Sequence, residues 1–245
     1  MIDFEFEFQY AEEKQPALQK IGGSIPAGRC VVLCGGSGCG KSTIARLIAS
    51  LWDVKDGIIE LGGVDIRTLP LTECTKRIAY VSQDNYLFDL SVMDNIRMGK
   101  KGASDEDVIA AAKKCGCHEF IVGLKNGYQT VCGVSGGHLS GGERQRISIA
   151  RAIMKDAPII ILDEATANVD PENEKELMEA VSELTHDKAV IMIAHRLKTV
   201  RNADRIFVVD YGEIVQKGAH DELVTADGLY RRFVVERKQA AGWKV

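Results

Sequence analysis

The sequence predicts an α/β fold that contains a parallel sheet, on the strength of three observations. Short apolar runs that end in polar residues alternate with stretches of helical periodicity. A glycine-rich segment of the form G-x-x-x-x-G-K-S, residues 35–42, lies between one such run and one such stretch. Residues 84–155 are mainly helical in pattern, which predicts one domain with a helical lobe (84–155) and a core lobe (1–83 and 156–245).

The elements of the first part of the core lobe follow from periodicity and turn residues. Residues 2–9 alternate between apolar and polar, as expected for a half-buried strand of an antiparallel sheet. Residues 31–33 form a buried strand, and the apolar residues between Ile44 and Leu51 recur at helical spacing. We further expect a hairpin of strands 57–61 and 64–66 around Gly62-Gly63, and a strand over 77–82 that ends at Gln83.

The remaining elements are predicted in the same way. Four helices are expected in the helical lobe, over 92–98, 105–114, 118–124 and 140–154. Apolar strands over 159–162 and 189–194 end at Asp163-Glu164 and at His195. Between them lies a helix over 171–184, with Asp170 as its N-cap and Pro171 in its first position. A hairpin of 205–210 and 213–217 and a helix over 227–238 complete the chain.

Composition narrows the class of protein. With 245 residues, 45% hydrophobic and 27% charged, the chain has the composition of a soluble globular protein. A net charge of −4 provides no basic field, so nucleic acid is not an expected partner. The acidic, alternating N-terminal stretch is not expected to be a signal peptide. Seven cysteines indicate a reducing compartment, and Cys115 and Cys117 are interpreted as thiols that pack between helices.

The segment at residues 35–42 has the properties of a phosphate-binding loop. Its glycines at 35, 36, 38 and 40 permit positive φ, so the loop can direct its N–H groups at a phosphate chain. Lys41 would reach the β- and γ-phosphates, and Ser42 would bind Mg²⁺. Cys39 lies inside this loop beside Lys41; if it is exposed it should be the most reactive cysteine, and otherwise it is an inert core thiol.

Polar residues at strand ends are candidates for the chemistry. The carboxyl ends of parallel strands meet at one edge of a sheet, so Gln83, Asp163, Glu164 and His195 can converge with the phosphate-binding loop. Asp163 has the place of an acid that holds Mg²⁺, and Glu164 could polarise a water for attack on the γ-phosphate. A histidine after a buried strand is more commonly a core residue, although His195 could instead hold the γ-phosphate.

A second helix start has features of an anion site. Ser140 and Glu143 satisfy a capping box, which an ordinary helix start would explain. Gly141 and Gly142 are not explained in this way, because each glycine costs a helix about 0.5–1 kcal/mol relative to alanine. Glycines at a helix N-terminus allow an anion to touch the backbone. One nucleotide could contact both the Lys41 and the Ser140 helix starts only if it lay between two protein surfaces.

With the segment Leu-Ser-Gly-Gly-Glu at 139–143 beside the phosphate-binding loop, the chain resembles the nucleotide-binding domain of an ATP-binding cassette (ABC) transporter over nearly its whole length. The resemblance implies a P-loop NTPase fold with a RecA-like core, an antiparallel β-subdomain and a helical subdomain that carries this signature motif. It implies ATP and Mg²⁺ as cofactors. It also implies ATP hydrolysis coupled to transmembrane transport, and a head-to-tail dimer with a second ABC domain.

The resemblance also assigns roles to residues. Glu164 is similar to the catalytic base, His195 to the switch histidine, and Gln83 to the glutamine that joins Mg²⁺ and the water to a transmembrane partner. Asp163 and Ser42 resemble the other Mg²⁺ ligands, and residues 167–170 the loop that crosses the dimer interface. Tyr10 matches the aromatic residue that stacks on adenine, although a strand-end tyrosine is more often a core residue. The remaining residues expected to contact the nucleotide are Gly36, Ser37, Gly38, Cys39, Gly40, Lys41, Thr43, Ser140, Gly141, Gly142 and Asp170.

The resemblance is closest to exporter-type domains. It rests on residues 82–88 with 94–96, and on 194–197 with 202–204. Val134 departs from that branch, which usually has an acidic residue there for the contact with the membrane domain, and residues 29–34 are more similar to importer or energy-coupling subunits. The chain is therefore expected at the cytoplasmic face of the cell membrane, as a subunit or as part of a half-transporter. An importer-type subunit, a DNA-maintenance ATPase and a non-hydrolysing ABC module are the alternatives.

Overall fold

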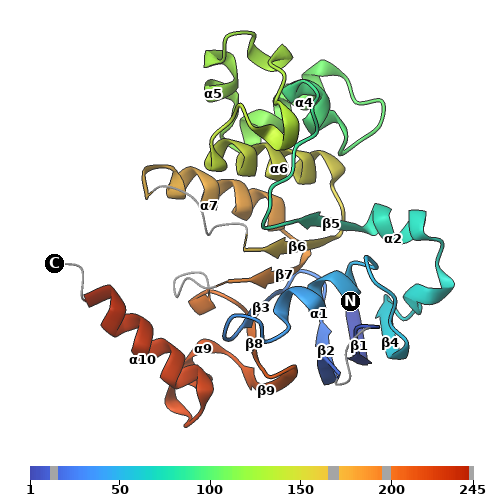
Figure 1. Cartoon of the computed structure of the whole chain (residues 1–245), viewed down its shortest axis with the longest axis vertical. Coiled ribbons are helices and arrows are strands. Elements are labelled where there is room, and N and C mark those ends of the chain that lie inside the picture. Colours follow the sequence, from blue (N-terminus) through green and yellow to red (C-terminus); the bar gives the residue numbers. More distant parts are fainter. Residues whose placement is uncertain (12–15, 165–170, 195–199, 243–245) are drawn as a thin grey trace. The chain divides into compact units, whose positions relative to one another are not determined.

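The structure, a computed structural model, describes residues 1–11, 16–164, 171–194 and 200–242 (Figure 1). The chain divides into two compact units, which are described separately: residues 1–75 with 187–245, and residues 76–186. The lobe boundaries expected from the sequence, near residues 84 and 155, stay a prediction.

The first unit contains a three-stranded antiparallel sheet. The central strand β1 (Ile2–Phe8) pairs on one side with β2 (Leu18–Ile25) and on the other with β4 (Asp56–Leu61). The alternate residues Ile2, Phe4 and Phe6 are buried, as the period of two in the sequence predicts. The antiparallel strand expected at the start of the chain is thus confirmed.

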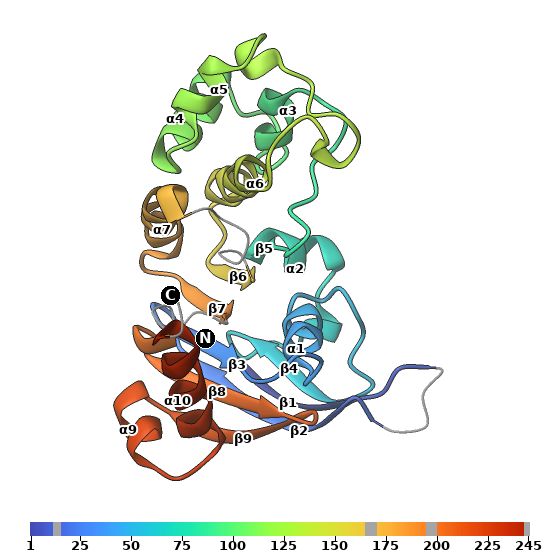
Figure 2. The same cartoon turned by 60° about the vertical axis from the view of Figure 1, so that its left-hand side comes forward.

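The first unit also contains parallel strands that lead to the phosphate-binding loop. β3 (Cys30–Cys34) lies between β7 (Ala189–Ile193) and β8 (Arg205–Asp210) and is parallel to both. β9 (Glu213–Gly218) continues from β8 as an antiparallel hairpin. α1 (Lys41–Ile48) follows β3, and α9 (His220–Thr225) and α10 (Leu229–Gly242) follow β9 (Figure 2).

Several expectations for this unit were wrong. Residues 64–66 form no second strand of a hairpin; β4 pairs with β1, and the chain makes one bridge between Glu60 and Asp65 before a 3-10 turn at Ile66–Thr68. β2 was not expected, nor were α2 (Leu71–Arg77) and α9. Arg77, which the division of the chain assigns to the second unit, ends α2 rather than beginning the next strand. Leu51 lies beyond the end of α1 and is 54% exposed.

The second unit combines two parallel strands with a group of helices. β5 (Ile78–Val81) is parallel to β6 (Ile159–Asp163). The long helix α6 (Gly141–Lys155) packs against several helices of the unit, namely α3 (Val92–Arg97), α4 (Asp105–Lys114) and α7 (Pro171–Thr185) (Figure 1). The short helix α5 (His118–Gly123) follows α4 in the chain. The helices expected between residues 92 and 154 are confirmed to within one residue at each end.

Helix starts in this unit follow the capping rules. Ser104 and Asp107 form a capping box at α4, and Ser91 accepts a hydrogen bond from the N–H of Asp94 at α3. The N-cap expected at Asp170 lies outside the described residues. Among the helices that the structure describes, none has the length and hydropathy of a membrane span.

Candidate functional site

The segment between β3 and α1 has the backbone of a phosphate-binding loop. Gly35, Gly38 and Gly40 have φ values of 151°, 75° and 106°, in the region that favours glycine. A side chain at Gly35 would place its Cβ 2.1 Å from the carbonyl oxygen of Val209, so this position has no room for one. The middle of the loop, residues 36–38, is exposed. The loop can therefore present its backbone to a ligand from the outside while its ends are closely packed.

The side chain of Lys41 is held inside this loop. Its Nζ atom donates hydrogen bonds to the carbonyl oxygens of Gly36 at 2.5 Å and of Gly35 at 3.3 Å. Lys41 is only 5% exposed. Carbonyl oxygens supply partial negative charge where a phosphate would supply more, so the ammonium group already occupies a position suited to an anion. The role that the sequence predicts for Lys41 stays a prediction.

The hairpin of β8 and β9 supports the loop from behind. The N–H of Gly212, in the hairpin turn, donates to the carbonyl oxygen of Cys39 at 3.1 Å. In turn, the N–H of Gln19 donates to the carbonyl of Gly212 at 2.8 Å. These contacts link residues distant in sequence, and the hairpin thereby fixes the backbone of the loop.

The structure buries the thiol of Cys39. Its side chain is 8% exposed, and its Sγ lies 3.4 Å from Nζ of Lys41. The exposure on which preferential reactivity depends is absent, so the structure supports the interpretation of Cys39 as a core thiol. Burial also raises the pKa of the neighbouring Cys34 to about 12, which keeps that thiol protonated at neutral pH.

An aromatic cluster lies beside the loop. The hydroxyl of Tyr10 is 3.0 Å from Oγ1 of Thr43, and its ring makes edge contacts with Phe8 and Trp52. The rings of Phe8 and Trp52 stack at 5.8 Å with an interplanar angle of 7°. Tyr10 is half-buried, and this position is compatible with both interpretations of the residue. Part of the side chain packs in the core as expected of a strand-end tyrosine, and the ring also lies beside the loop. Sequence reasoning did not single out Trp52.

The second unit holds the acidic candidates at the ends of its strands. Asp163 is the last residue of β6 and is 2% exposed. Its Oδ2 accepts a hydrogen bond of 2.7 Å from the hydroxyl of Tyr80 on β5, because the parallel register places these two strands side by side. A charge-assisted bond of this kind keeps a buried carboxylate in one orientation. Tyr80 was missed from the sequence, where nothing distinguishes it from other strand residues.

Gln83 and Glu164 are joined directly. Nε2 of Gln83 donates to Oε2 of Glu164 at 3.0 Å. Glu164 has a φ of 51°, a conformation that costs a non-glycine residue about 1 kcal/mol or more. Two residues that the sequence predicts to act on the same water are thus in contact, and the strained one follows Asp163.

The signature segment caps α6 as the sequence predicts. Oγ of Ser140 accepts from the N–H of Glu143 at 3.3 Å, and Oε2 of Glu143 accepts from the N–H of Ser140 at 2.8 Å. A Cβ at Gly142 would meet no atom within 4 Å, so internal packing does not demand glycine there. Gly141 and Gly142 are half-exposed in the first turn. The backbone at this helix start is therefore open to an external group.

The segment after Gln83 is held by a buried polar pair. Asn95 is fully buried, and its Nδ2 donates to the carbonyls of Phe88 and Leu90. Arg151 on α6 donates to Oδ1 and to the carbonyl of Asn95, each at 2.9 Å. Arg151, which sequence reasoning missed, links α6 to the segment between Gln83 and α3.

One departure from the expected pattern is visible on the surface. Val134, where exporters were expected to carry an acid, is 79% exposed at the start of a 3-10 turn (Val134–Gly136) before α6. The segment at 167–170, with Asp170, and the candidate His195 lie outside the described residues. The sequence predictions for them stay predictions.

The donor set suits Mg²⁺. Ser42, Gln83 and Asp163 offer a hydroxyl, an amide and a carboxylate oxygen, which are hard donors of the kind that Mg²⁺ prefers. Within the described residues, no group of three or more His, Cys, Asp or Glu side chains gathers as a purely protein-made metal site would require. The chemistry of these residues fits an ion that takes further oxygen ligands from a nucleotide.

Comparison with known proteins identifies the class. The family model for ABC transporters matches residues 18–167, which is more than half of the chain. The chain therefore belongs to the ABC transporter family. The P-loop NTPase fold predicted from the sequence is confirmed.

Individual relatives place it within that family. The ATP-dependent lipid A-core flippase of Syntrophus aciditrophicus (strain SB) is 47% identical over 221 residues, which cover 90% of this chain and 37% of that protein. The uncharacterized ABC transporter ATP-binding protein YknV of Bacillus subtilis (strain 168) is 44% identical over 230 residues, 94% of this chain and 38% of that protein. This chain spans about two fifths of the length of these relatives.

A solved structure agrees with both. A bacterial Atm1-family ABC exporter with ATP bound superimposes with a TM-score of 0.90 at 36% identity, covering 96% of this chain and 42% of that one. The chain is thus a homologue of the ATP-binding part of exporter-type ABC proteins. The importer and DNA-maintenance interpretations are less well supported than the exporter interpretation.

Proposed function

We propose that this chain is the ATP-binding and ATP-hydrolysing domain of an exporter-type ABC transporter, and that its ATP-driven dimerisation powers transport across a membrane. The observation that carries the proposal is the loop at residues 35–42, whose backbone is open to solvent while its lysine is held by loop carbonyls. A loop of this form, in a chain that also carries the signature helix start at Ser140, is suited to the phosphates of a nucleotide.

Nucleotide binding is assigned to residues of the first unit. Lys41 would exchange its carbonyl partners Gly35 and Gly36 for the β- and γ-phosphates, since a phosphate oxygen is the stronger acceptor. The N–H groups of the exposed residues 36–38, together with those at the start of α1, would surround the phosphate chain. Tyr10 would stack on the adenine, and its hydrogen bond to Thr43 would help to orient the ring.

Hydrolysis is assigned to residues that follow the strands. Glu164 would accept a proton from the attacking water as general base, and its hydrogen bond from Gln83 would hold the carboxylate in place. Mg²⁺, when bound with the nucleotide by Ser42, Gln83 and Asp163, would neutralise charge on the phosphates. Tyr80 would keep Asp163 oriented for this purpose. His195 and Asp170 keep the roles that the family resemblance implies, as a γ-phosphate contact and as part of the dimer-crossing loop.

Two partners complete the proposal. A second ABC domain, identical or related, would present its Ser140, Gly141 and Gly142 to the γ-phosphate bound at Lys41, in a head-to-tail dimer. A transmembrane domain would take up the resulting motion, and this domain would then lie at the cytoplasmic face of the membrane. The likeness to exporter-type proteins supports this arrangement over an importer subunit.

The binding of MgATP tests the proposal. Calorimetric titration should give a stoichiometric signal with the wild-type chain and none with Lys41→Ala, because the variant loses the only cation inside the loop at residues 35–42. Lys55→Ala, an exposed lysine of the same unit, is the control and should bind as the wild type does. Equal affinity of Lys41→Ala and wild type would contradict the assignment of the loop.

A further inference from the structure

The end of α4 brings two cysteines together across a single glycine. Gly116 has a φ of 65°, the left-handed conformation that ends many helices. The N–H of Gly116 donates to the carbonyl of Lys113 at 3.1 Å, and the N–H of Cys117 donates to that of Ala112 at 2.9 Å. This pair of bonds is the Schellman motif, with Cys115 as the C-cap. The turn folds the chain back, and the Sγ atoms of Cys115 and Cys117 lie 3.0 Å apart.

The two thiols are enclosed by helices of the second unit. Both cysteines are fully buried. Sγ of Cys115 also contacts the carbonyl oxygens of Ala112 on α4, at 3.5 Å, and of Arg146 on α6, at 3.6 Å. The part of the chain that the structure describes offers no third His, Cys, Asp or Glu to make a metal site with them. A pair of thiols at this separation is instead suited to the chemistry of sulfur with sulfur.

We propose that Cys115 and Cys117 are a reversible disulfide site, oxidised by hydrogen peroxide and reduced again by glutathione. A disulfide bond is about 2.05 Å long, so the sulfurs need to approach by only about 1 Å. Hydrogen peroxide converts one thiol to a sulfenic acid and releases one water. The second thiol attacks that sulfur and releases a second water, so two thiols and one peroxide yield one disulfide and two waters. Two molecules of glutathione thiol reverse the reaction and leave as glutathione disulfide.

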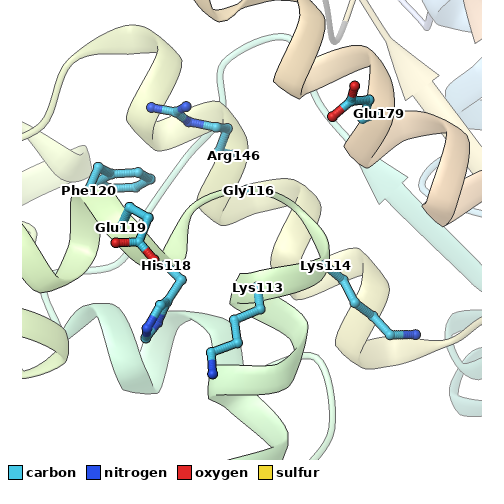
Figure 3. A pocket seen from close by; sticks show the side chains of 8 residues that line it. All are labelled: Lys113, Lys114, Gly116, His118, Glu119, Phe120, Arg146 and Glu179. Carbon is cyan, nitrogen blue, oxygen red and sulfur yellow. The ribbon is translucent and has the colours of Figure 1, made fainter.

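A cavity borders the turn that holds the pair. A cavity of about 490 Å³ is lined by Gly116, the residue between the two cysteines, together with Lys114, His118 and Arg146 (Figure 3). Hydrogen peroxide is little larger than water, so the cavity admits it as far as Gly116, and a local opening of the turn then exposes the sulfurs. α5, which begins directly after Cys117, has only 6 residues, and a short helix opens locally at low cost.

The environment of the two thiols determines how fast they are oxidised and how readily the disulfide is reduced. The contact with Cys115 and burial raise the pKa of Cys117, so this thiol keeps its proton at neutral pH. Because the thiolate is the form that attacks peroxide, oxidation is slower than that of an exposed free thiol. The disulfide also lacks the S–H group of Cys115, which in the reduced form lies within reach of the carbonyls of Ala112 and Arg146. Losing these contacts favours the reduced state, so glutathione should reverse the reaction completely.

Peptide mass spectrometry tests the proposal. The folded chain is treated with hydrogen peroxide, alkylated with a maleimide under denaturing conditions, and digested with trypsin. Cleavage after Lys114 and Lys125 yields the peptide 115–125, which contains both cysteines and no other. This peptide should lose two hydrogen atoms and carry no maleimide, and incubation with millimolar glutathione before alkylation should restore two alkylated thiols. The far-ultraviolet circular dichroism of the oxidised chain should match that of the reduced chain.

Two variants separate the pair from single thiols. Cys117→Ser removes one partner with little change in volume, so the peptide 115–125 should then form no disulfide. Cys74→Ser, which removes a buried thiol of the first unit, should leave the disulfide unchanged. The proposal is overturned if the peptide from folded, oxidised wild type carries two maleimides or a sulfinic acid. It is equally overturned if the disulfide appears only together with loss of the helical signal.

Discussion

Nε2 of Gln83, two residues beyond β5, donates a hydrogen bond of 3.0 Å to Oε2 of Glu164, the residue that follows β6. The partner carboxylate belongs to a residue in the left-handed conformation, with a φ of 51°. Strain of this kind is kept where surrounding contacts determine the conformation, and it gathers at functional sites. This bond therefore orients the proposed general base before any water is bound.

The Gln83 bond predicts a change in the pH dependence of hydrolysis. Gln83→Glu would place a second carboxylate beside Glu164, and two carboxylates this close cannot both be ionised without cost. One of them keeps its proton to a higher pH, and a general base works only when deprotonated. Relative to the wild type, we expect Gln83→Glu to lose more ATPase activity at pH 6 than at pH 8. The reason is that the deprotonated fraction of the general base drops about tenfold for each pH unit below its raised pKa in this variant.

A neutral variant separates charge from the lost hydrogen bond. Gln83→Met has a similar length and no charge, so it should lower activity without moving the pH profile. The measurement is phosphate release across the pH range at saturating ATP. Identical profiles for Gln83→Glu and Gln83→Met would show that the side chain at position 83 does not face Glu164 in the active chain.

The Tyr80 hydroxyl should lower the concentration of Mg²⁺ that the chain needs for half-maximal ATPase activity. Tyr80→Phe removes the hydroxyl that donates to Asp163 at 2.7 Å and leaves the ring in place. A hydrogen bond to a charged group is worth about 1.5–3 kcal/mol, so Asp163 should be less well oriented and half-maximal activity should need about tenfold more Mg²⁺. The check is a Mg²⁺ titration of ATPase activity.

The matched control for Tyr80 is Tyr86→Phe. Tyr86 is an exposed tyrosine of the same unit, and its ring makes an edge contact with Phe88. Its variant should have the Mg²⁺ dependence of the wild type. A Tyr80→Phe titration curve that coincides with that of Tyr86→Phe would remove Tyr80 from the proposed positioning role.

Gly142 should show opposite effects on stability and function. A Cβ here meets no atom within 4 Å, and alanine is better than glycine in a helix by about 0.5–1 kcal/mol. Gly142→Ala should therefore raise the thermal unfolding temperature by a few degrees. It should also lower ATPase activity at least tenfold, because the methyl group occupies space needed by the γ-phosphate of the partner's nucleotide.

Gly123→Ala provides the comparison for Gly142→Ala. Gly123 ends α5, and a Cβ there also meets nothing within 4 Å. This variant should keep wild-type activity. Full activity in Gly142→Ala would contradict the approach of an anion to this helix start.

The signature helix start also predicts the oligomeric state. In the background of Glu164→Gln, which should retain ATP, the chain should elute as a dimer with MgATP. Adding Ser140→Arg puts a large side chain at the N-cap of α6, where the partner's γ-phosphate would bind, and should return the chain to a monomer. Size-exclusion chromatography with light scattering distinguishes the two. A dimer of the double variant with ATP would show that Ser140 is not the contact between copies.

Local signals made much of the fold predictable. The phosphate-binding loop was recognisable because glycines, Lys41 and Ser42 stand together between a strand and a helix. α4 was predicted at both ends from its helical pattern, and the structure shows a cap at Ser104 and a left-handed glycine after Cys115 at these ends. Elements with periodicity and caps in one stretch need no tertiary information.

Elements that depend on distant partners were missed. β2 contains Gly22 and Gly23, which argue against a strand, yet a Cβ at Gly23 would come within 2.7 Å of the ring of Phe207. Gly23 is therefore required by a contact with a residue that is distant in the sequence, and the local sequence gives no sign of that contact. The expected strand at 64–66 failed because the side chain of Asp65 accepts from the N–H of Arg67 and starts a 3-10 turn instead.

The same division applies to the site. Lys41, Ser140 and Glu164 belong to motifs with fixed spacing and could be named in advance. Tyr80 and Arg151 act across the fold, on Asp163 and Asn95, and no spacing in the sequence links them to these partners.

The rate of phosphate release by the wild-type chain and by Glu164→Gln tests the account most directly. General-base catalysis contributes about 10²–10⁴-fold, so the variant should hydrolyse ATP at least a hundredfold more slowly while binding MgATP with near-wild-type affinity. That result would make this chain an ATPase whose base is Glu164. Turnover of the variant within a factor of about two of the wild type, or no hydrolysis by the wild type under conditions where it binds MgATP and dimerises, would contradict the account.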